Sequence, residues 1–437
     1  MRFGTDGIRG VANAQLTPEL ALAIGRAAAR VLGGPVITVG RDPRWSGPML
    51  EAAFVAGACA EGVSVELLGV VPTPAVALRS ETANCPAAMI SASHNPFGDN
   101  GIKLFAPGGL KLSDEVQALL EAELDAAGAK ADAPTGRDVG TVGTYDVAPD
   151  YVRHVGESIP DGALAGLKVV LDCGNGASSD VASTVFTRLG AEVVALHVTP
   201  DGSNINDASG STHPESLRTA VVAEGAQLGF AFDGDADRML AVDHQGRLID
   251  GDQLIAVAAV DLKRRGLLVN DTVVVTVMSN LGFRIGMAAE GIEVVDTAVG
   301  DRYVLEALDQ GGHVLGGEQS GHIIFRDRAT TGDGVLSAVV IAEIVARTGR
   351  PLADLADAAM TRLPQVLRNV RIQAPMPDVT DRIADELTAA AAALGADGRV
   401  LVRPSGTEPV VRVMVEAVDA TTAQQWCDHL VQAVESL

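Results

Sequence analysis

The strongest constraint on the fold is a pattern that occurs three times: a short apolar run, a polar turn, and a longer stretch of helical period. The apolar runs are VITVG from Val36, KVVLDCGNG from Lys168 and TVVVTVMSN from Thr272. A buried strand that leads through a turn into a helix is typical of βαβ units. Because the runs lie more than 100 residues apart, they predict three similar α/β domains with mixed, largely parallel sheets.

The 437 residues are too many for one hydrophobic core and divide into segments at changes of pattern. An Ala-, Gly- and Asp-rich stretch at 126–141 places the first boundary near residue 150. Another boundary follows the strand-like MLAVDHQGRLID, and the last lies where helix-like sequence gives way to VLRNVRIQAP. The expected domains are 1–150, 151–250, 251–364 and 365–437, the last being a smaller α+β domain.

The charge and the cysteines limit the location and the partners. A net charge of -23 and a pI near 4.6 argue against binding to nucleic acid or to an anionic membrane. No uncharged apolar run reaches the roughly 18 residues that span a bilayer, and the N-terminus resembles no signal peptide. Four separated cysteines fit reduced thiols. We expect a cytoplasmic protein whose oligomeric state is open, a homodimer being one alternative.

The sharpest local motif is FDGDADR, in which Asp233, Asp235 and Asp237 alternate and Arg238 follows. Three carboxylates this close repel one another unless a cation lies among them, and their oxygens suit Mg²⁺ or Ca²⁺. A solvated acidic turn is the plain alternative, and an EF-hand loop is excluded because Gly and Glu are missing at its required positions. The apolar LGFAF run before the motif favours a metal site at the end of a strand.

A second motif, ISASHNPFGDNGIKLF, presents polar side chains after the apolar strand AAMI. Ser91, Ser93 and His94 lie in its loop, and Lys103 follows as a source of positive charge or of a proton. Taken alone, either serine could simply cap a helix or complete a turn. The sequence shows no classical base–acid triad that would indicate a hydrolase.

Two further loops carry ligand-binding side chains. In GGEQSGH, Glu318 and Ser320 alternate, so both could face one side and bind adjacent sugar hydroxyls, although a simple turn is the alternative. In RPSGTEP, a guanidinium, two hydroxyls and a flexible Gly combine into a donor set for a phosphate dianion, with a polar hairpin loop as the alternative. These donors are Arg403, Ser405, Gly406 and Thr407.

The motifs occur in the order of the α-D-phosphohexomutase superfamily, which the chain resembles over essentially its whole length. They are FGTDGIRG, SASHNP, DGDADR, GGEQSGH and RPSGTEP. Within that superfamily the chain is most similar to the bacterial phosphoglucosamine mutases, through FGTDGIRG, Ala236 and Gln319. Ser209, where relatives often carry Cys, and GRDPR in place of GRDTR are departures that remove no required group. The resemblance implies four domains around a central cleft.

The resemblance also implies a role for each motif residue. Ser93 would be the phosphorylated serine, and its phosphate would complete a Mg²⁺ site made by Asp233, Asp235 and Asp237. Glu318 and Ser320 would bind sugar hydroxyls, and the loop from Arg403 through Ser405, Gly406 and Thr407 would bind phosphate. The residues expected to line the catalytic cleft are Arg9, His94, Lys103, Arg238 and His322.

The expected reaction interconverts glucosamine 6-phosphate and glucosamine 1-phosphate, a step that would feed cell-wall UDP-N-acetylglucosamine synthesis. Phospho-Ser93 would pass its phosphoryl group to the sugar, and glucosamine 1,6-bisphosphate would serve as intermediate and activator with one Mg²⁺ per chain. A phosphomannomutase/phosphoglucomutase with the same chemistry is the nearest alternative. A metal-dependent phosphatase and a non-catalytic phosphosugar-binding protein are the others.

Overall fold

A computed structural model describes residues 4, 7–126, 133–374, 376–404 and 410–437. The chain forms two compact units, one made of residues 1–277 with 292–356 and the other of residues 278–291 with 357–437. Each of the four sheets takes its strands from one of the predicted segments, while the predicted boundaries at 150, 250 and 364 stay predictions. The expected fold class is confirmed: three α/β sheets are followed by a smaller α+β region.

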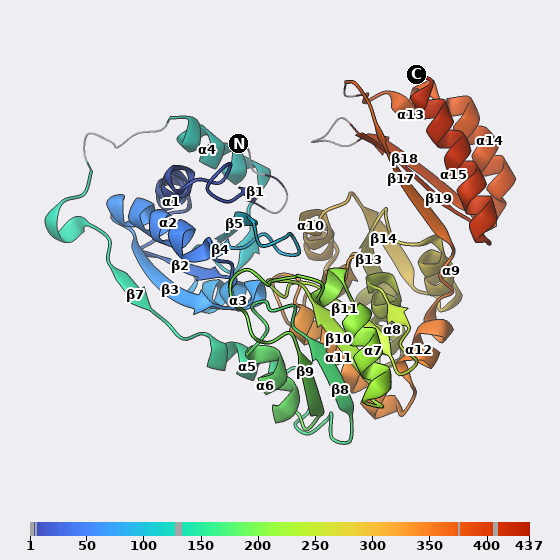
Figure 1. Cartoon of the computed structure of the whole chain (residues 1–437), viewed down its shortest axis with the longest axis horizontal. Helices are drawn as coiled ribbons and strands as arrows, with labels where there is room; N and C mark the ends of the chain where they lie inside the picture. The colour runs from blue at the N-terminus through green and yellow to red at the C-terminus, as the bar shows by residue number, and fades with distance from the viewer. Residues whose placement is uncertain (1–3, 5–6, 127–132, 375, 405–409) are drawn as a thin grey trace. The chain divides into compact units, whose positions relative to one another are not determined.

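The first sheet is mixed, since its central strands run parallel and one edge is antiparallel. Helices α1 and α2 pack closely on it (Figure 1) and bury its apolar core. In spatial order the strands are β1 (Ile8–Val11), β5 (Asp99–Ala106), β4 (Ala87–Ile90), β2 (Val36–Arg41), β3 (Ser64–Val70) and β7 (Val142–Thr144), with β6 (Leu110–Lys111) beside β5. The helices of this region are α1 (Pro18–Leu32), α2 (Gly47–Ala60), α3 (Thr73–Ala83) and α4 (Asp114–Asp125).

The second sheet has a parallel centre, in which the apolar runs at β8 and β10 lie side by side (Figure 1). Both strands are buried along most of their length, as their uninterrupted apolar sequence predicts. The order is β12 (Leu248–Ile249), β11 (Met239–Asp243), β10 (Leu228–Phe232), β8 (Lys168–Asp172) and β9 (Glu192–Leu196). The helices are α5 (Ala148–Gly156), α6 (Val181–Arg188) and α7 (Glu215–Ala223).

The third sheet is surrounded by long apolar helices. Both α8 and α11 are buried over most of their residues, and the sequence of α11 is correspondingly apolar along most of its length. The strand order is β14 (Glu293–Thr297), β13 (Thr272–Thr276), β15 (Leu315–Gly317) and β16 (Ile323–Phe325). The helices are α8 (Gly251–Arg264), α10 (Asp301–Gly311), α11 (Gly334–Thr348) and α12 (Leu352–Ala359). Among the described residues, no helix combines the length and the apolar character that crossing a membrane requires.

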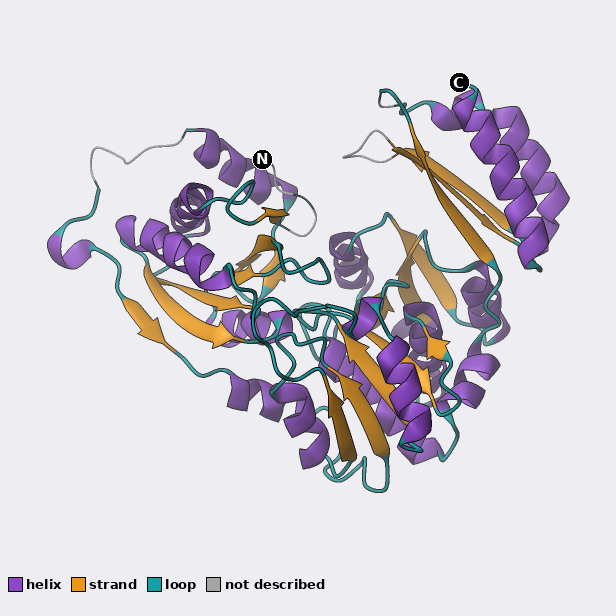
Figure 2. Ribbon diagram, in the orientation of Figure 1, coloured by secondary structure: helices purple, strands orange, loops and turns teal. Residues whose placement is uncertain are grey.

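The second unit contains an antiparallel sheet with helices along one face (Figure 2). Its strands, in order, are β17 (Gln365–Arg371), β19 (Val410–Glu416) and β18 (Arg399–Pro404), and its helices are α13 (Val379–Arg382), α14 (Ala384–Leu394), α15 (Ala420–Glu435) and α9 (Leu281–Ala289). The buried Glu416 of β19 fastens α9 to the sheet, because its carboxylate accepts hydrogen bonds from Leu281 N at 3.1 Å and from Asn280 Nδ2 at 3.1 Å.

A buried acid begins α11. Asp333 Oδ1 accepts hydrogen bonds from Leu336 N at 2.9 Å and from the Tyr151 hydroxyl at 2.7 Å. Burial raises the pKa of Asp333 to about 6, although these bonds act in the opposite direction. Both bonds reach the same oxygen, so the second carboxyl oxygen can carry a proton without losing either of them.

Asp333→Asn should therefore change how stability depends on pH. Because the folded-state pKa lies above the unfolded value near 3.9, wild-type stability falls as the pH rises from about 4 to about 6. Asn cannot ionise but keeps the accepting oxygen, so the variant should gain about 2–3 kcal/mol relative to wild type between pH 4 and pH 7. Urea unfolding at several pH values measures the difference. The exposed Asp354→Asn is the control, and a pH-independent difference for Asp333→Asn would contradict the expectation.

Candidate active site

A buried serine and an acidic loop meet where two strands end. Ser93 follows the carboxyl end of β4, and Asp233 follows the carboxyl end of β10. Ser93 is fully buried, and its hydroxyl donates to Asp233 Oδ2 at 2.5 Å and lies 3.3 Å from His94 Nδ1. A Cβ on Gly234 would come within 2.6 Å of the Ser93 carbonyl oxygen, so glycine permits this approach. The two loops that the sequence singled out therefore form one site.

The three aspartates form a candidate metal centre. One carboxylate oxygen from each of Asp233, Asp235 and Asp237 lies within 4.8 Å of the others, and all three side chains are buried. Lys103 Nζ donates to Asp235 at 2.7 Å and to Asp237 at 2.9 Å. Oδ1 of Asp235 and of Asp237 accepts no hydrogen bond from any described residue. Buried carboxylate oxygens without donors are costly, and a hard cation would satisfy them.

Asp233 and Asp237 lie close together, but their pKa values are shifted in opposite directions. Burial and the charges of Asp237 and Asp235 raise the pKa of Asp233 well above its usual range. Burial also acts upward on the pKa of Asp237, but Lys103, His322 and Arg238 outweigh it and hold this pKa well below the usual range. Repulsion among buried carboxylates and attraction to nearby cations are the causes. A divalent ion among the three carboxylates would reduce the repulsion that raises the pKa of Asp233.

His94 lies beside the serine hydroxyl, and two arginines act on its charge. Arg238 N donates to Asp233 Oδ1 at 3.1 Å. Arg9 lies in β1 opposite Gly101 of β5, the strand that carries Lys103. Burial, together with the charges of Arg238 and Arg9, lowers the pKa of His94 to about 4. The two arginines therefore place positive charge near His94, the neighbour of Ser93.

His322 lies on the third sheet's side of the cluster and is also buried. Its Nδ1 lies 3.8 Å from Asp237 Oδ1, and its Nε2 lies 3.6 Å from Asp301 Oδ2. Burial acts to lower the pKa of His322, but the neighbouring Asp237 and Asp301 raise it overall. Asp301, at the start of α10, in turn pairs with Lys111 at 2.7 Å.

Glu318 and Ser320 lie in a tight turn between β15 and β16. Glu318 N donates to the His322 carbonyl oxygen at 2.9 Å, and Gly321 N donates to the Glu318 carbonyl oxygen at 3.0 Å. Gly321 has φ +90°, and a Cβ there would come within 2.2 Å of the Met239 carbonyl oxygen. Glu318 Oε1 accepts from Gly300 N at 3.1 Å, and the Ser320 hydroxyl lies 3.4 Å from Glu318 Oε2. The two side chains are adjacent and accessible, as sugar-hydroxyl ligands would need to be.

The predicted phosphate loop belongs to the second unit, and only part of it is described. Arg403, near the end of β18, is half-buried and pairs in register with Arg412 of β19. Burial and then the charge of Arg412 lower the pKa of Arg403. Two arginines at directly paired positions repel each other, and a bound anion would relieve that repulsion. Ser405, Gly406 and Thr407 lie outside the described residues.

The sequence analysis missed residues that hold the site together. Thr73, at the start of α3, donates from its backbone N to the Asp235 carbonyl oxygen at 2.9 Å and from its hydroxyl to Asp235 Oδ2 at 2.6 Å. Arg44, Asn206 and Asp301 also contact residues of the site. Arg44 belongs to the GRDPR motif, whose difference from GRDTR gives no indication of this role, because a side chain that contacts backbone oxygens leaves no sequence pattern at its partners.

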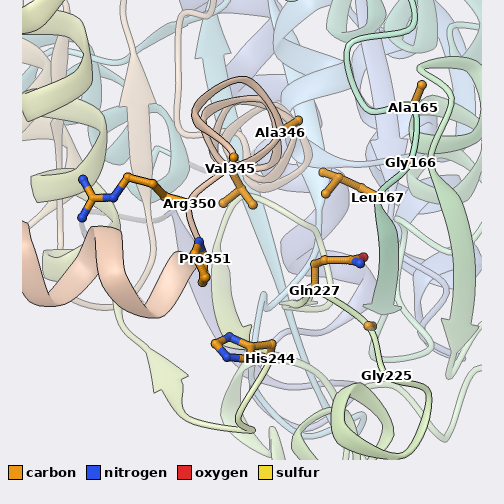
Figure 3. A pocket seen from close by; sticks show the side chains of 12 residues that line it. Ala165, Gly166, Leu167, Gly225, Gln227, His244, Val345, Ala346, Arg350 and Pro351 are labelled. Carbon is orange, nitrogen blue, oxygen red and sulfur yellow. The ribbon is translucent and has the colours of Figure 1, made fainter.

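A cavity of about 520 Å³ lies beside the starts of two strands of the second sheet (Figure 3). It is lined by Leu167 and Val345, with Gln227, His244 and Arg350 around it. Leu167 and Gln227 immediately precede β8 and β10, so the cavity lies at the amino ends of these strands. The aspartates follow the carboxyl end of β10, and the cavity is therefore separate from the candidate active site.

A nucleophile-type hydroxyl beside a buried triad of carboxylates and several cations defines a phosphoryl-transfer enzyme. The chain belongs to the phosphoglucomutase/phosphomannomutase family, all four of whose domains match it. The α/β/α domains I, II and III match residues 1–131, 149–246 and 250–363, and the C-terminal domain matches residues 357–433. The predicted superfamily and the isomerase class are confirmed.

Individual relatives show which members of the family this chain is similar to. A curated protein from Streptomyces avermitilis, named phosphoglucosamine mutase, is 54% identical over 99% of this chain and 98% of its own length. A solved structure of a phosphoglucomutase/phosphomannomutase family protein from Burkholderia thailandensis is 29% identical, with a TM-score of 0.81 over 99% of this chain and 97% of that one. The Aspergillus fumigatus N-acetylphosphoglucosamine mutase, solved with GlcNAc-6P and magnesium, shares the fold at 18% identity, with a TM-score of 0.73 over 100% of this chain and 96% of that one. The predicted resemblance to phosphoglucosamine mutases is confirmed.

Proposed function

We propose that the protein interconverts glucosamine 6-phosphate and glucosamine 1-phosphate through a phosphate carried on Ser93. The contact of 2.5 Å between the Ser93 hydroxyl and Asp233 of the buried triad is the observation that carries this proposal. The name of the Streptomyces relative supports glucosamine phosphate as the substrate. The phosphomannomutase/phosphoglucomutase alternative is not favoured by that similarity, and family membership favours a mutase over a phosphatase or a binding protein.

The reaction consists of two phosphoryl transfers. In the first, the Ser93 Oγ–P bond breaks and a bond from phosphorus to O1 of glucosamine 6-phosphate forms, while O1 loses its proton and Ser93 Oγ gains one. The resulting 1,6-bisphosphate reorients. In the second transfer, the O6–P bond breaks and the Ser93 Oγ–P bond forms again, while the Ser93 hydroxyl loses its proton and O6 gains one, which leaves glucosamine 1-phosphate. Glucosamine 1,6-bisphosphate is thus both the intermediate and, when added, the activator that phosphorylates Ser93.

The proposed metal is Mg²⁺, which Asp233, Asp235 and Asp237 would hold together with a phosphate oxygen on Ser93. The carboxylate oxygens without donors fit a hard cation. When bound, the ion would neutralise charge on the transferring phosphoryl group.

The chain's own side chains would perform the remaining tasks. Lys103 and Arg238 provide positive charge at the phosphate, and His94, 3.3 Å from the Ser93 hydroxyl, is placed to exchange its proton. Glu318 and Ser320 would bind sugar hydroxyls in either orientation of the intermediate. The loop that begins at Arg403 would hold the phosphate that is not reacting.

The substrate is tested by comparing kcat/KM for glucosamine 6-phosphate, glucose 6-phosphate and mannose 6-phosphate, with Mg²⁺ and a hexose bisphosphate present. We expect glucosamine 6-phosphate to be preferred by about 100-fold or more, because a site built for an amine leaves polar groups unpaired around a hydroxyl. Equal or faster rates with mannose or glucose phosphate would keep the mutase chemistry and reject the proposed sugar.

We also propose that the protein is located in the cytoplasm. All four cysteines are free, and three of them are buried, which fits a reducing compartment.

A further inference from the structure

We propose that Arg44 is a positioning residue that fixes the Ser93 loop in one geometry for both phosphoryl transfers. The inference rests on the proposed function of Ser93. Among the described residues, the hydrogen-bond partners of the Arg44 side chain include neither the reacting hydroxyl nor Asp233, Asp235 or Asp237, so it acts on the reaction through the backbone of the serine loop.

Arg44 is fully buried, and every N–H of its guanidinium has a partner. Nε donates to Asp42 Oδ2 at 2.8 Å. The four terminal N–H groups all donate to backbone carbonyl oxygens of the serine loop, an arrangement that only a planar guanidinium can provide. These carbonyls belong to Ser93 at 2.9 Å, Asn95 at 2.8 Å, Pro96, and Asp99 at 3.0 Å.

The conformation of Ser93 explains why such a support is needed. Ser93 has φ +53°, in the left-handed region that residues with a side chain rarely adopt. Its carbonyl oxygen also accepts from Asn206 Nδ2 at 2.9 Å, and its N donates to the Ser91 hydroxyl at 2.9 Å. The Ser91 hydroxyl donates to Asp42 Oδ2, the same oxygen that accepts from Arg44. The strained turn is therefore held from both its carbonyl and its amide side through one buried ion pair.

The catalytic cycle makes this geometry important. Phosphoryl transfer requires the attacking and leaving oxygens to lie roughly in line, and small errors of position reduce the rate strongly. Ser93 must meet that requirement twice in each turnover, once with its phosphate leaving and once as the attacking hydroxyl. A sugar can be repositioned by its own contacts, but the serine oxygen depends on the loop, and hence on Arg44.

Arg44→Lys tests the proposal, because lysine keeps the charge but has only three donors and no planar fork. We expect kcat to fall about 10–100-fold, with the KM for glucosamine 6-phosphate nearly unchanged. Phosphorylated variant enzyme should also lose its phosphate to water faster than phosphorylated wild type, as followed by intact-protein mass. Arg30→Lys is the matched control, since the Arg30 guanidinium also donates to two partners, Glu61 and Glu123, neither of which belongs to the site. It should keep wild-type kcat.

If Arg44→Lys does not fold, Asn206→Ala decides, because Asn206 Nδ2 donates to the carbonyl oxygens of Ser93 at 2.9 Å and of Asn95 at 3.2 Å, two of the oxygens that Arg44 also binds. Its kcat should also fall, but by less than that of Arg44→Lys, and its KM should again be unchanged. The proposal is overturned if either folded variant has wild-type kcat and wild-type phosphoserine lifetime, whatever its melting temperature. A wild-type enzyme without phosphoserine-dependent mutase activity would instead reject the proposed function.

Discussion

Ser93→Ala should abolish mutase turnover, lowering kcat by at least about 10³-fold, because the variant loses the hydroxyl that contacts Asp233 and would carry the phosphate. The fold should survive, since the lost hydroxyl donates to a single carboxylate and methyl is easily accommodated. A coupled assay for glucosamine 1-phosphate measures the loss. Intact-protein mass should show that the phosphate adduct found on active wild-type enzyme is missing from the variant.

Ser91→Ala is the matched control for the site of phosphorylation. The Ser91 hydroxyl donates to Asp42 at 2.6 Å and accepts from Ser93 N. A phosphate on Ser91 would break both hydrogen bonds. This variant should still carry the phosphate adduct. Near-normal turnover by Ser93→Ala, or an adduct that disappears only with Ser91→Ala, would reject the phosphoserine mechanism proposed above.

Asp235→Asn should weaken Mg²⁺ binding and reduce kcat/KM together, the latter by about 10²–10³-fold. Oδ2 of Asp235 accepts from Thr73 and Lys103, which leaves Oδ1 as the oxygen available to a cation. Asn would place an amide where an anionic oxygen is needed, and its NH₂ group cannot bind a metal. Calorimetric titration with MgCl₂ measures the affinity directly, without relying on activity.

The exposed Asp161→Asn is the control for charge alone, and it should bind Mg²⁺ as wild type does. Raising the Mg²⁺ concentration should recover part of the activity of Asp235→Asn, because the other two carboxylates remain. Unchanged metal affinity in Asp235→Asn would show that the triad is not the metal site, even if activity were lost.

Much of the fold could be predicted because its strongest signals are local. Apolar runs such as Val169–Leu171 became buried strands, and the loops after AAMI and LGFAF carry Ser93 and the aspartates. The site's chemistry was readable for the same reason, since each motif contributes several functional groups within a few residues.

What the sequence could not reveal depends on contacts between distant segments. Arg44 reaches backbone oxygens about fifty residues away, and backbone oxygens are identical at every position. The pairing of Lys103 with Asp235, and of Thr73 with the same residue, likewise depends on how the first two sheets are joined. Such partners carry no pattern in the sequence and become visible only when the tertiary structure is known.

The attachment of α9 to the C-terminal sheet matters to anyone who wishes to recombine this enzyme with a relative. Residues 278–291 belong to the same compact unit as residues 357–437. Glu416 contacts the start of α9, Asn280 binds the Leu363 carbonyl oxygen at 3.0 Å, and Arg399 binds that of Ser279 at 2.8 Å. A chimera that exchanges only residues 357–437 would pack the α9 segment of one protein against the C-terminal sheet of the other. Exchanging residues 278–291 together with residues 357–437 transfers the complete unit.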